Sequence, residues 1–154
     1  MKREVAQAVV DELVPRADVL TPNLWELGFI AGRALEDEVA VLAAARGLAP
    51  RVLVTSAPAG ADRTGVLDVT PHAAWRLSHG RFATAPNGTG DLLAALAVAA
   101  ILDGETSPND ARRAAAGVVD ALDGALALGA DNLPLARRGG DLRRPRAPVM
   151  IEAL

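Results

Sequence analysis

The chain has 154 residues, the size of one ordinary domain, with 51% hydrophobic residues, only 3% aromatic residues and a formal net charge of −3. It contains no cysteine, which excludes disulfides and cysteine-ligated zinc, and its two histidines are too few for a histidine-rich metal site. The charge gives no basic surface for a nucleic-acid partner, and no apolar run approaches the roughly 20 residues that span a bilayer, so we expect a cytoplasmic protein without nucleic-acid or membrane partners.

The first third of the chain alternates between helical and extended patterns. Val5, Val9 and Leu13 recur at helical spacing before Pro15, and Asn23 with Glu26 three residues later is typical of a helix start. A run rich in β-branched residues follows at 51–56. We predict helices over residues 2–14, 23–32 and 37–46, and strands over residues 17–21 and 51–56.

The remainder of the chain contains a hairpin pattern, a glycine loop and two long helical patterns. Ser107, Pro108 and Asp110 form a typical helix start, with Ser107 as the predicted cap. His72 and His79 are expected in surface turns, Trp25 and Trp75 as packing residues, and the arginine-rich stretch 137–146 as a solvated face. We predict strands over 66–70 and 74–78, extended segments at 81–84 and near 149–151, and helices over 91–102 and 107–128.

Strands that alternate with helices favour an α/β layered fold with a mainly parallel sheet. Only two segments, around Val19 and Val52, have the pattern of buried parallel strands. Because a sheet needs more strands than this to be stable alone, we expect it to be completed by another chain or by residues that are missing here.

The sequence Gly88-Thr89-Gly90-Asp91 is the strongest candidate for a chemical site. Glycines let the backbone approach a ligand closely, and the helix that follows directs its free N–H groups and positive dipole end toward the loop, which suits phosphate. Asp91 at the helix start can accept a proton from an attacking hydroxyl. The loop alone is equally compatible with a plain glycine turn in which Asp91 is an ordinary first-turn residue.

Three segments together resemble pyridoxal kinases of the ribokinase-like superfamily. Residues 69–104 resemble that family over their whole length, including its G-[TV]-G-D element. Residues 17–27 resemble its A-D-x-[IL]-x-P-N-x-x-E-[LA] segment, and residues 52–56 resemble its nucleotide-side strand. The resemblance implies an α/β, ribokinase-like fold in which residues 1–154 are the C-terminal, ATP-binding part and the N-terminal half is missing.

The resemblance also implies roles for individual residues. Gly88, Thr89 and Gly90 would form the anion hole, and Asp91 would contact the substrate and activate the pyridoxal 5′-hydroxyl as general base. Asn23 and Glu26 would organise Mg²⁺ and the phosphates through water, although the same pair is also a good helix cap. Further ATP contacts would come from Thr21, Thr55, Thr84, Ala85, Pro86 and Asn87.

The implied activity is ATP-dependent phosphorylation of the 5′-hydroxyl of pyridoxal, pyridoxine or pyridoxamine in vitamin B6 salvage, with ATP and Mg²⁺ as cofactors. A full member of the family is about twice this long and is expected to form a homodimer, so this chain is expected to be a truncated or partial enzyme. Two alternatives are a hydroxymethylpyrimidine kinase-like enzyme and a non-catalytic remnant that binds nucleotide or dimerises.

Overall fold

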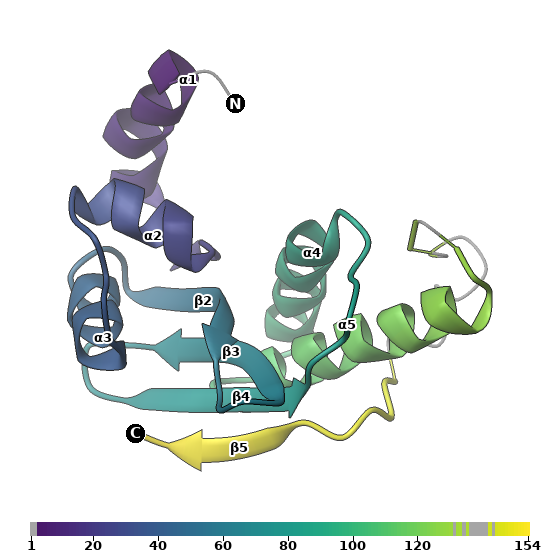
Figure 1. Cartoon of the computed structure of the whole chain (residues 1–154). Helices are drawn as coiled ribbons and strands as arrows, with labels where there is room; N and C mark the ends of the chain where they lie inside the picture. The colour runs from purple at the N-terminus through teal and green to yellow at the C-terminus, as the bar shows by residue number, and fades with distance from the viewer. Residues whose placement is uncertain (1–2, 131, 134, 136–141, 143) are drawn as a thin grey trace.

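A five-stranded mixed sheet is the frame of the computed structural model, which describes residues 3–130, 132, 133, 135, 142 and 144–154 (Figure 1). The strands lie in chain order across the sheet, and β1 pairs parallel with β2 while the other neighbours pair antiparallel. The strands are β1 (Val19–Leu20), β2 (Arg51–Pro58), β3 (Arg63–Val69), β4 (Ala74–Gly80) and β5 (Met150–Ala153).

The α/β class predicted from the sequence is confirmed, but the expectation of a mainly parallel sheet is wrong for the described residues. The only parallel pair among them is β1 with β2, the two segments that had the parallel pattern. Short turns join β2 to β3 and β3 to β4, and a short connection can join only antiparallel neighbours. The predicted extended segment near 149–151 is β5, which adds to the free edge of β4.

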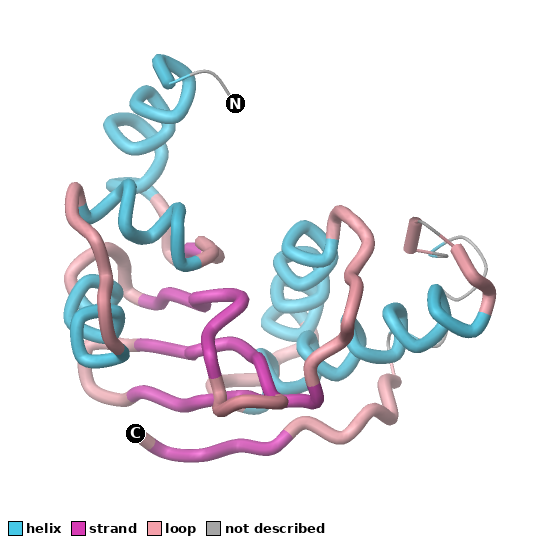
Figure 2. The backbone as a smooth tube through the Cα atoms, viewed as in Figure 1, coloured by secondary structure: helices cyan, strands magenta, loops and turns pink. Residues whose placement is uncertain are grey.

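Helices cover both faces of this sheet, shown in cyan beside the magenta strands in Figure 2. Alternate residues of a strand point to opposite faces, so Val52 and Val54 pack with α2 and α3 while Leu53 packs with α4 and α5. No helix among the described residues is long and apolar enough to cross a membrane. The α-helices are α1 (Arg3–Ala8), α2 (Leu24–Ala31), α3 (Glu38–Arg46), α4 (Thr89–Leu102) and α5 (Asn109–Ala127).

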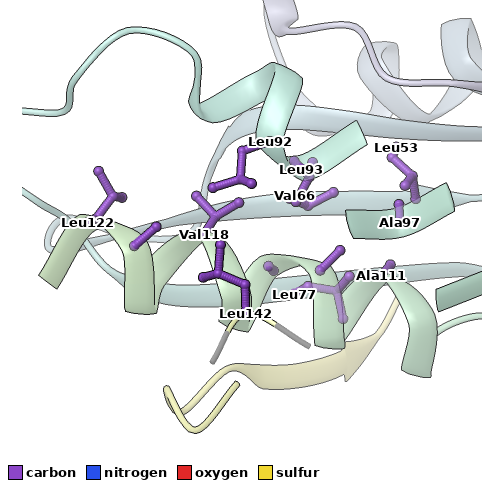
Figure 3. Close-up of a cluster of buried hydrophobic side chains, with 13 residues drawn as sticks. Leu53, Val66, Leu77, Leu92, Leu93, Ala97, Ala111, Val118, Leu122 and Leu142 are labelled. Atoms are coloured by element: carbon purple, nitrogen blue, oxygen red, sulfur yellow. The ribbon is translucent and has the colours of Figure 1, made fainter. Parts of the chain in front are cut away.

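The larger core cluster lies between the sheet and the α4–α5 pair. Figure 3 shows its strand residues facing side chains from both helices, and it also includes Leu142. The strands and α4 supply most of the large side chains of this cluster, because α5 contributes mainly alanines. Only Val118 and Leu122 are large side chains from α5. The labelled members are Leu53, Val66, Leu77, Leu92, Leu93, Ala97, Ala111, Val118, Leu122 and Leu142.

The end of the N-terminal helix and the start of α5 differ from the sequence prediction. The N-terminal helix gives way to a π-helical turn at Val9–Leu13 and a 3₁₀ turn at Val14–Arg16, which includes Pro15 because proline is tolerated in a first turn. Ser107 does not cap α5; its hydroxyl donates a hydrogen bond of 2.7 Å to Asp68 Oδ2, and α5 begins at Asn109 with no side-chain cap. Much of the predicted solvated face at 137–146 lies outside the described residues.

Gly65 is required by the close approach of β3 to β4. A Cβ atom at this position would lie 1.8 Å from the carbonyl oxygen of Leu77, and backbone atoms have little freedom to move away. We therefore expect Gly65→Ala to lower the free energy of unfolding by ~3 kcal/mol, the upper end of typical overpacking costs. Denaturant unfolding measures this, with Gly80→Ala as the control because a Cβ at Gly80 meets nothing within 4 Å. Equal stability of the two variants would contradict this reading of the β3–β4 contact.

Candidate functional site

A cleft of about 460 Å³ lies where the strand ends meet the first turn of α4 and the middle of α5. Its wall combines hydroxyl groups and an amide with an apolar surface from the two helices. The lining residues are Asn23, Thr55, Ser56, Thr64, Gly65, Val66, His79, Arg81, Phe82, Ala85, Thr89, Gly90, Leu93, Ala115, Val118 and Leu122.

A bulge in β2 brings two hydroxyl residues to the cleft. The pairing of β2 with β3 shifts register between Val54 and Ala57, and Ser56 between them has a φ of 57°. A non-glycine residue in this left-handed region costs of order 1 kcal/mol, and such strain is concentrated at functional sites. Thr55 N donates to the carbonyl oxygen of Pro22 over 2.8 Å, so the bulge lies directly beside Asn23.

The first turn of α4 offers unpaired backbone donors to the same cleft. Gly88 is its N-cap with a φ of 91°, a conformation that favours glycine, and no side chain caps the helix. The first N–H groups of an α-helix have no partner within the helix. Thr89 and Gly90 line the cleft, so this 14-residue helix presents free donors and its positive dipole end to a bound anion.

Asn23 and Glu26 form the capping box that the sequence allowed. Asn23 Oδ1 accepts from Glu26 N and Glu26 Oε2 accepts from Asn23 N, each over 2.9 Å. Asn23 also lines the cleft, whereas Glu26 does not. No cluster of three or more His, Cys, Asp or Glu side chains that could hold a metal occurs in the described part of the chain.

The structure brings together five of the residues that the sequence predicted for the site. Asn23, Thr55, Ala85, Thr89 and Gly90 all line the cleft. Asp91 follows Gly90 in the first turn of α4 but is exposed and outside the lining. The other predicted residues outside the lining are Thr21, Glu26, Thr84, Pro86, Asn87 and Gly88.

Sequence reasoning missed the residues at the far end of the cleft. His79 was expected in a surface turn, and that prediction is wrong because it lies on β4 opposite Thr64 and faces the cleft. The two-residue alternation from Leu77, which faces α5, could have placed it there. His79 and Phe82 have ring centroids 6.0 Å apart and form a partly aromatic wall.

The charge of the cleft contrasts with the net negative charge of the chain. None of its lining residues is a carboxylate, and the ionisable ones are His79 and Arg81. Arg81 is held at the hairpin mouth by its backbone N–H, which donates to the carbonyl oxygen of Asp62 over 2.9 Å. Its guanidinium makes no hydrogen bond to any residue that the structure describes. The cleft is therefore suited to an anionic ligand with a flat or apolar portion.

The family model for phosphomethylpyrimidine kinase matches residues 1–136, and the chain belongs to this family. The chain is 39% identical over 135 residues to a pyridoxine/pyridoxal/pyridoxamine kinase of Bordetella bronchiseptica, which covers 82% of this chain and 47% of the relative. It is 33% identical over 148 residues to a pyridoxal kinase of Leifsonia xyli, covering 92% of this chain and 52% of that relative. The resemblance to pyridoxal kinases is thereby confirmed.

Solved structures confirm the expected ribokinase-like fold. Pyridoxal kinase from Entamoeba histolytica matches with a TM-score of 0.81 at 22% identity, over 100% of this chain and 57% of that chain. Pyridoxal kinase from Leishmania donovani, solved with ADP and pyridoxamine, matches with a TM-score of 0.85 at 21% identity, over 99% of this chain and 57% of that chain. The chain spans about half the length of the curated relatives it matches.

Proposed function

We propose that residues 1–154 are the C-terminal, ATP-handling part of a kinase that phosphorylates the 5′-hydroxyl of pyridoxal, pyridoxine or pyridoxamine. The observation that carries the proposal is the cleft, whose described wall holds no carboxylate and includes the open first turn of α4. The names of the relatives supply the substrate class, and the ADP complexes of structural neighbours supply the nucleotide. A homodimer, as expected of the family, is part of the same proposal.

The nucleotide phosphates are assigned to the polar end of the cleft. Backbone N–H groups of Thr89 and Gly90 bind phosphoryl oxygens there, and the hydroxyls of Thr55 and Ser56 add donors from the β2 bulge. Gly88 permits the turn, and the loop containing Thr84, Ala85, Pro86 and Asn87 covers the nucleotide, with Thr21 behind the phosphates. The nucleoside extends toward Phe82, His79 and the apolar face of α5.

The donor set of the described residues fits a magnesium ion that arrives with the nucleotide. Mg²⁺ keeps several waters and commonly binds through one or two carboxylates together with substrate phosphates, so a dedicated protein cage is not required. Glu26 would hold the magnesium ion through water. Its Oε2 atom accepts the hydrogen bond of the helix cap, and its Oε1 atom makes no bond to the described residues. Asn23, the partner of Glu26 in the capping box, lines the cleft. When bound, Mg²⁺ neutralises charge on the transferred phosphoryl group.

Asp91 is assigned as the general base that accepts the proton of the vitamin hydroxyl. It lies one residue after Gly90, which lines the cleft, and a helix start favours an anion electrostatically. Its exposure in this chain leaves it open to a substrate at the mouth of the cleft. In-line phosphoryl transfer requires the attacking hydroxyl to lie opposite the leaving oxygen, so the base would contact the hydroxyl while the first turn of α4 holds the equatorial oxygens of the transferred group.

A hydroxymethylpyrimidine kinase is the second candidate, because the matching family model carries the name phosphomethylpyrimidine kinase. The two functions share the nucleotide side and differ in the acceptor alcohol. Phosphorylation assays with pyridoxal and with hydroxymethylpyrimidine, on an enzyme that contains this chain and the rest of the fold, separate them. Greater kcat/KM for the pyrimidine would replace the vitamin B6 assignment, and inactivity toward both would favour a non-catalytic remnant.

Arg81 supplies a further test of the nucleotide assignment. A charge-assisted hydrogen bond from its guanidinium to the bound nucleotide is worth about 1.5–3 kcal/mol. We expect Arg81→Gln to weaken Mg·ATP binding at least about tenfold, since about 1.4 kcal/mol corresponds to a factor of ten. Calorimetric titration measures the affinity, and Arg46→Gln on the exposed end of α3 serves as the matched control. Affinities of the two variants within twofold of each other would remove Arg81 from the site.

A further inference from the structure

A buried ionic cluster joins β2, β3 and α5 on the α5 side of the sheet. Arg51 donates to both oxygens of Asp68, over 2.8 Å to Oδ1 and 2.7 Å to Oδ2, and its Nη2 donates to Asp110 Oδ1 over 2.7 Å. A further contact joins Nη1 to Asp110 Oδ2. The side chains of Arg51, Asp68 and Asp110 are 12%, 0% and 1% exposed. Two carboxylates therefore share one guanidinium in the interior.

Each of the three elements that this cluster joins also contributes residues to the wall of the cleft. Arg51 begins β2, which carries Thr55 and Ser56 to the cleft further along. Asp68 lies near the end of β3, whose second residue Thr64 lines the cleft, and Asp110 lies in the first turn of α5. The cluster and the cleft thus lie toward opposite ends of the two strands, with α5 extending from the first to the second.

The side chains on the packing face of α5 do little by themselves to fix the position of this helix along the sheet. Most of its buried residues are small. Large side chains interlock only locally, at Val118 and Leu122 and where Leu96 of α4 fits against Gly117. Ridges and grooves of large side chains are what normally fix a helix against its neighbour. The buried residues of α5 are Asp110, Ala111, Ala114, Ala115, Ala116, Gly117, Val118, Val119, Ala121, Leu122, Gly124 and Ala125. A bidentate guanidinium–carboxylate contact, by contrast, is directional and tolerates little displacement.

Additional hydrogen bonds hold each carboxylate in one orientation. Ser107, in the loop before α5, donates its hydroxyl to Asp68, and Asp110 Oδ1 accepts from the backbone N–H of Ala111 over 2.7 Å. Burial of Arg51 by itself would lower the pKa of its guanidinium, but the bonds to Asp110 and Asp68 outweigh burial and raise that pKa above its ordinary value. The cluster is therefore kept charged and oriented at the junction of three elements.

We propose that Arg51, Asp68 and Asp110 are positioning residues that fix the register of α5 on the sheet and thereby set the wall of the cleft formed by Ala115, Val118 and Leu122. Stability alone does not account for such a cluster, because replacing a buried ion group by apolar residues of similar volume is often neutral or stabilising. The nucleotide part of its test rests on the proposed function, whereas the effect on α5 does not.

The decisive variant combines Arg51→Met, Asp68→Leu and Asp110→Leu, which removes the charges together and leaves none unpaired. We expect a folded chain whose stability is no lower than that of the wild type. Amide hydrogen exchange in α5 should nevertheless be at least tenfold faster, and affinity for Mg·AMP-PCP at least tenfold weaker. Unchanged exchange in α5 and unchanged affinity in a variant as stable as the wild type would overturn the proposal, and so would faster exchange that is fully accounted for by a loss of global stability.

Two milder variants keep the test informative if the triple variant does not fold. Asp110→Asn preserves shape and the acceptor for Ala111 N, and Arg51→Lys preserves charge but not the planar fork. We expect both to loosen α5 and weaken nucleotide binding at temperatures where they are folded. If the Arg51→Lys variant has the same exchange rates and nucleotide affinity as the wild type, charge alone suffices, and the cluster does not fix the register of α5.

The chain provides a matched control in a second cluster of one arginine and two carboxylates. Arg76 on β4 bonds to Glu38 of α3 and Glu152 of β5, and none of these lies on α5 or in the cleft. Arg76→Met with Glu38→Gln and Glu152→Gln should leave exchange in α5 and nucleotide affinity unchanged. If exchange in α5 responds as expected while even the wild type binds no nucleotide, the positioning role stands and the proposed function fails.

Discussion

Asp91→Asn is expected to lower turnover of pyridoxal by roughly 10²–10⁴-fold, the usual contribution of general-base catalysis. Asparagine keeps the shape of the side chain but cannot accept the proton of the vitamin hydroxyl. Affinity for Mg·ATP should change little, because the phosphates are assigned to backbone groups of Thr89 and Gly90 and Asp91 is outside the cleft lining. Turnover and nucleotide affinity are measured side by side in an enzyme reconstituted from this chain and the part of the Bordetella bronchiseptica kinase that it does not match.

Asp123→Asn is the appropriate control for this substitution, since Asp123 is an exposed carboxylate on α5 and does not line the cleft. Near-normal turnover in the Asp91 variant would remove that residue from the role of base. Weakened nucleotide affinity with intact turnover would instead make Asp91 a binding or metal-organising residue.

Gly90→Val is expected to abolish measurable nucleotide binding in a chain that still folds. Gly90 lines the cleft, and a Cβ added there meets nothing within 4 Å, so the protein itself can accommodate the side chain. The added branched group then occupies the space assigned to the phosphates, beside the free N–H groups of α4. Calorimetry with Mg·ATP measures the loss, which we expect to exceed a hundredfold, the factor that corresponds to about 2.7 kcal/mol.

Gly47→Val provides the comparison for the glycine substitution, because Gly47 is exposed at the end of α3 and is also open to a Cβ. This control should bind nucleotide as the wild type does. If Gly90→Val binds nucleotide within threefold of the control while both are folded, the phosphates do not lie against the first turn of α4. Gly88→Val is less informative, since the left-handed φ of Gly88 strains any side chain regardless of a ligand.

The local elements were predictable from the sequence because short-range signals determine them. Periodic apolar residues and the Asn23–Glu26 box located α2, and the hairpin pattern located β3 and β4 within a few residues. The failures came where tertiary contacts override local preference. Ser107 has the sequence of a cap, but its hydroxyl donates instead to the buried carboxylate of Asp68, and a hydrogen bond to a charged acceptor is stronger than a neutral cap.

The site was predictable where a motif fixes it and unpredictable where strand register does. Thr89 and Gly90 belong to the Gly88–Asp91 run, so their place at the open end of α4 follows from the sequence. Ser56 reaches the cleft only through the bulge in β2, and no local pattern reveals a bulge. Arg81 and Phe82 reach it because the β3–β4 hairpin returns to the same edge, which depends on a pairing between distant residues.

The most direct test of the nucleotide-binding cleft is a titration of the isotopically labelled chain with Mg·AMP-PCP, followed through its backbone amide resonances. The chain should first show a dispersed spectrum, which establishes that it is folded. We predict saturable shifts at Ser56, Thr89, Gly90 and Arg81, the residues on the polar and cationic wall of the cleft. A folded chain with no saturable shift at millimolar nucleotide, or with shifts confined to the α2–α3 side of the sheet, would contradict the account.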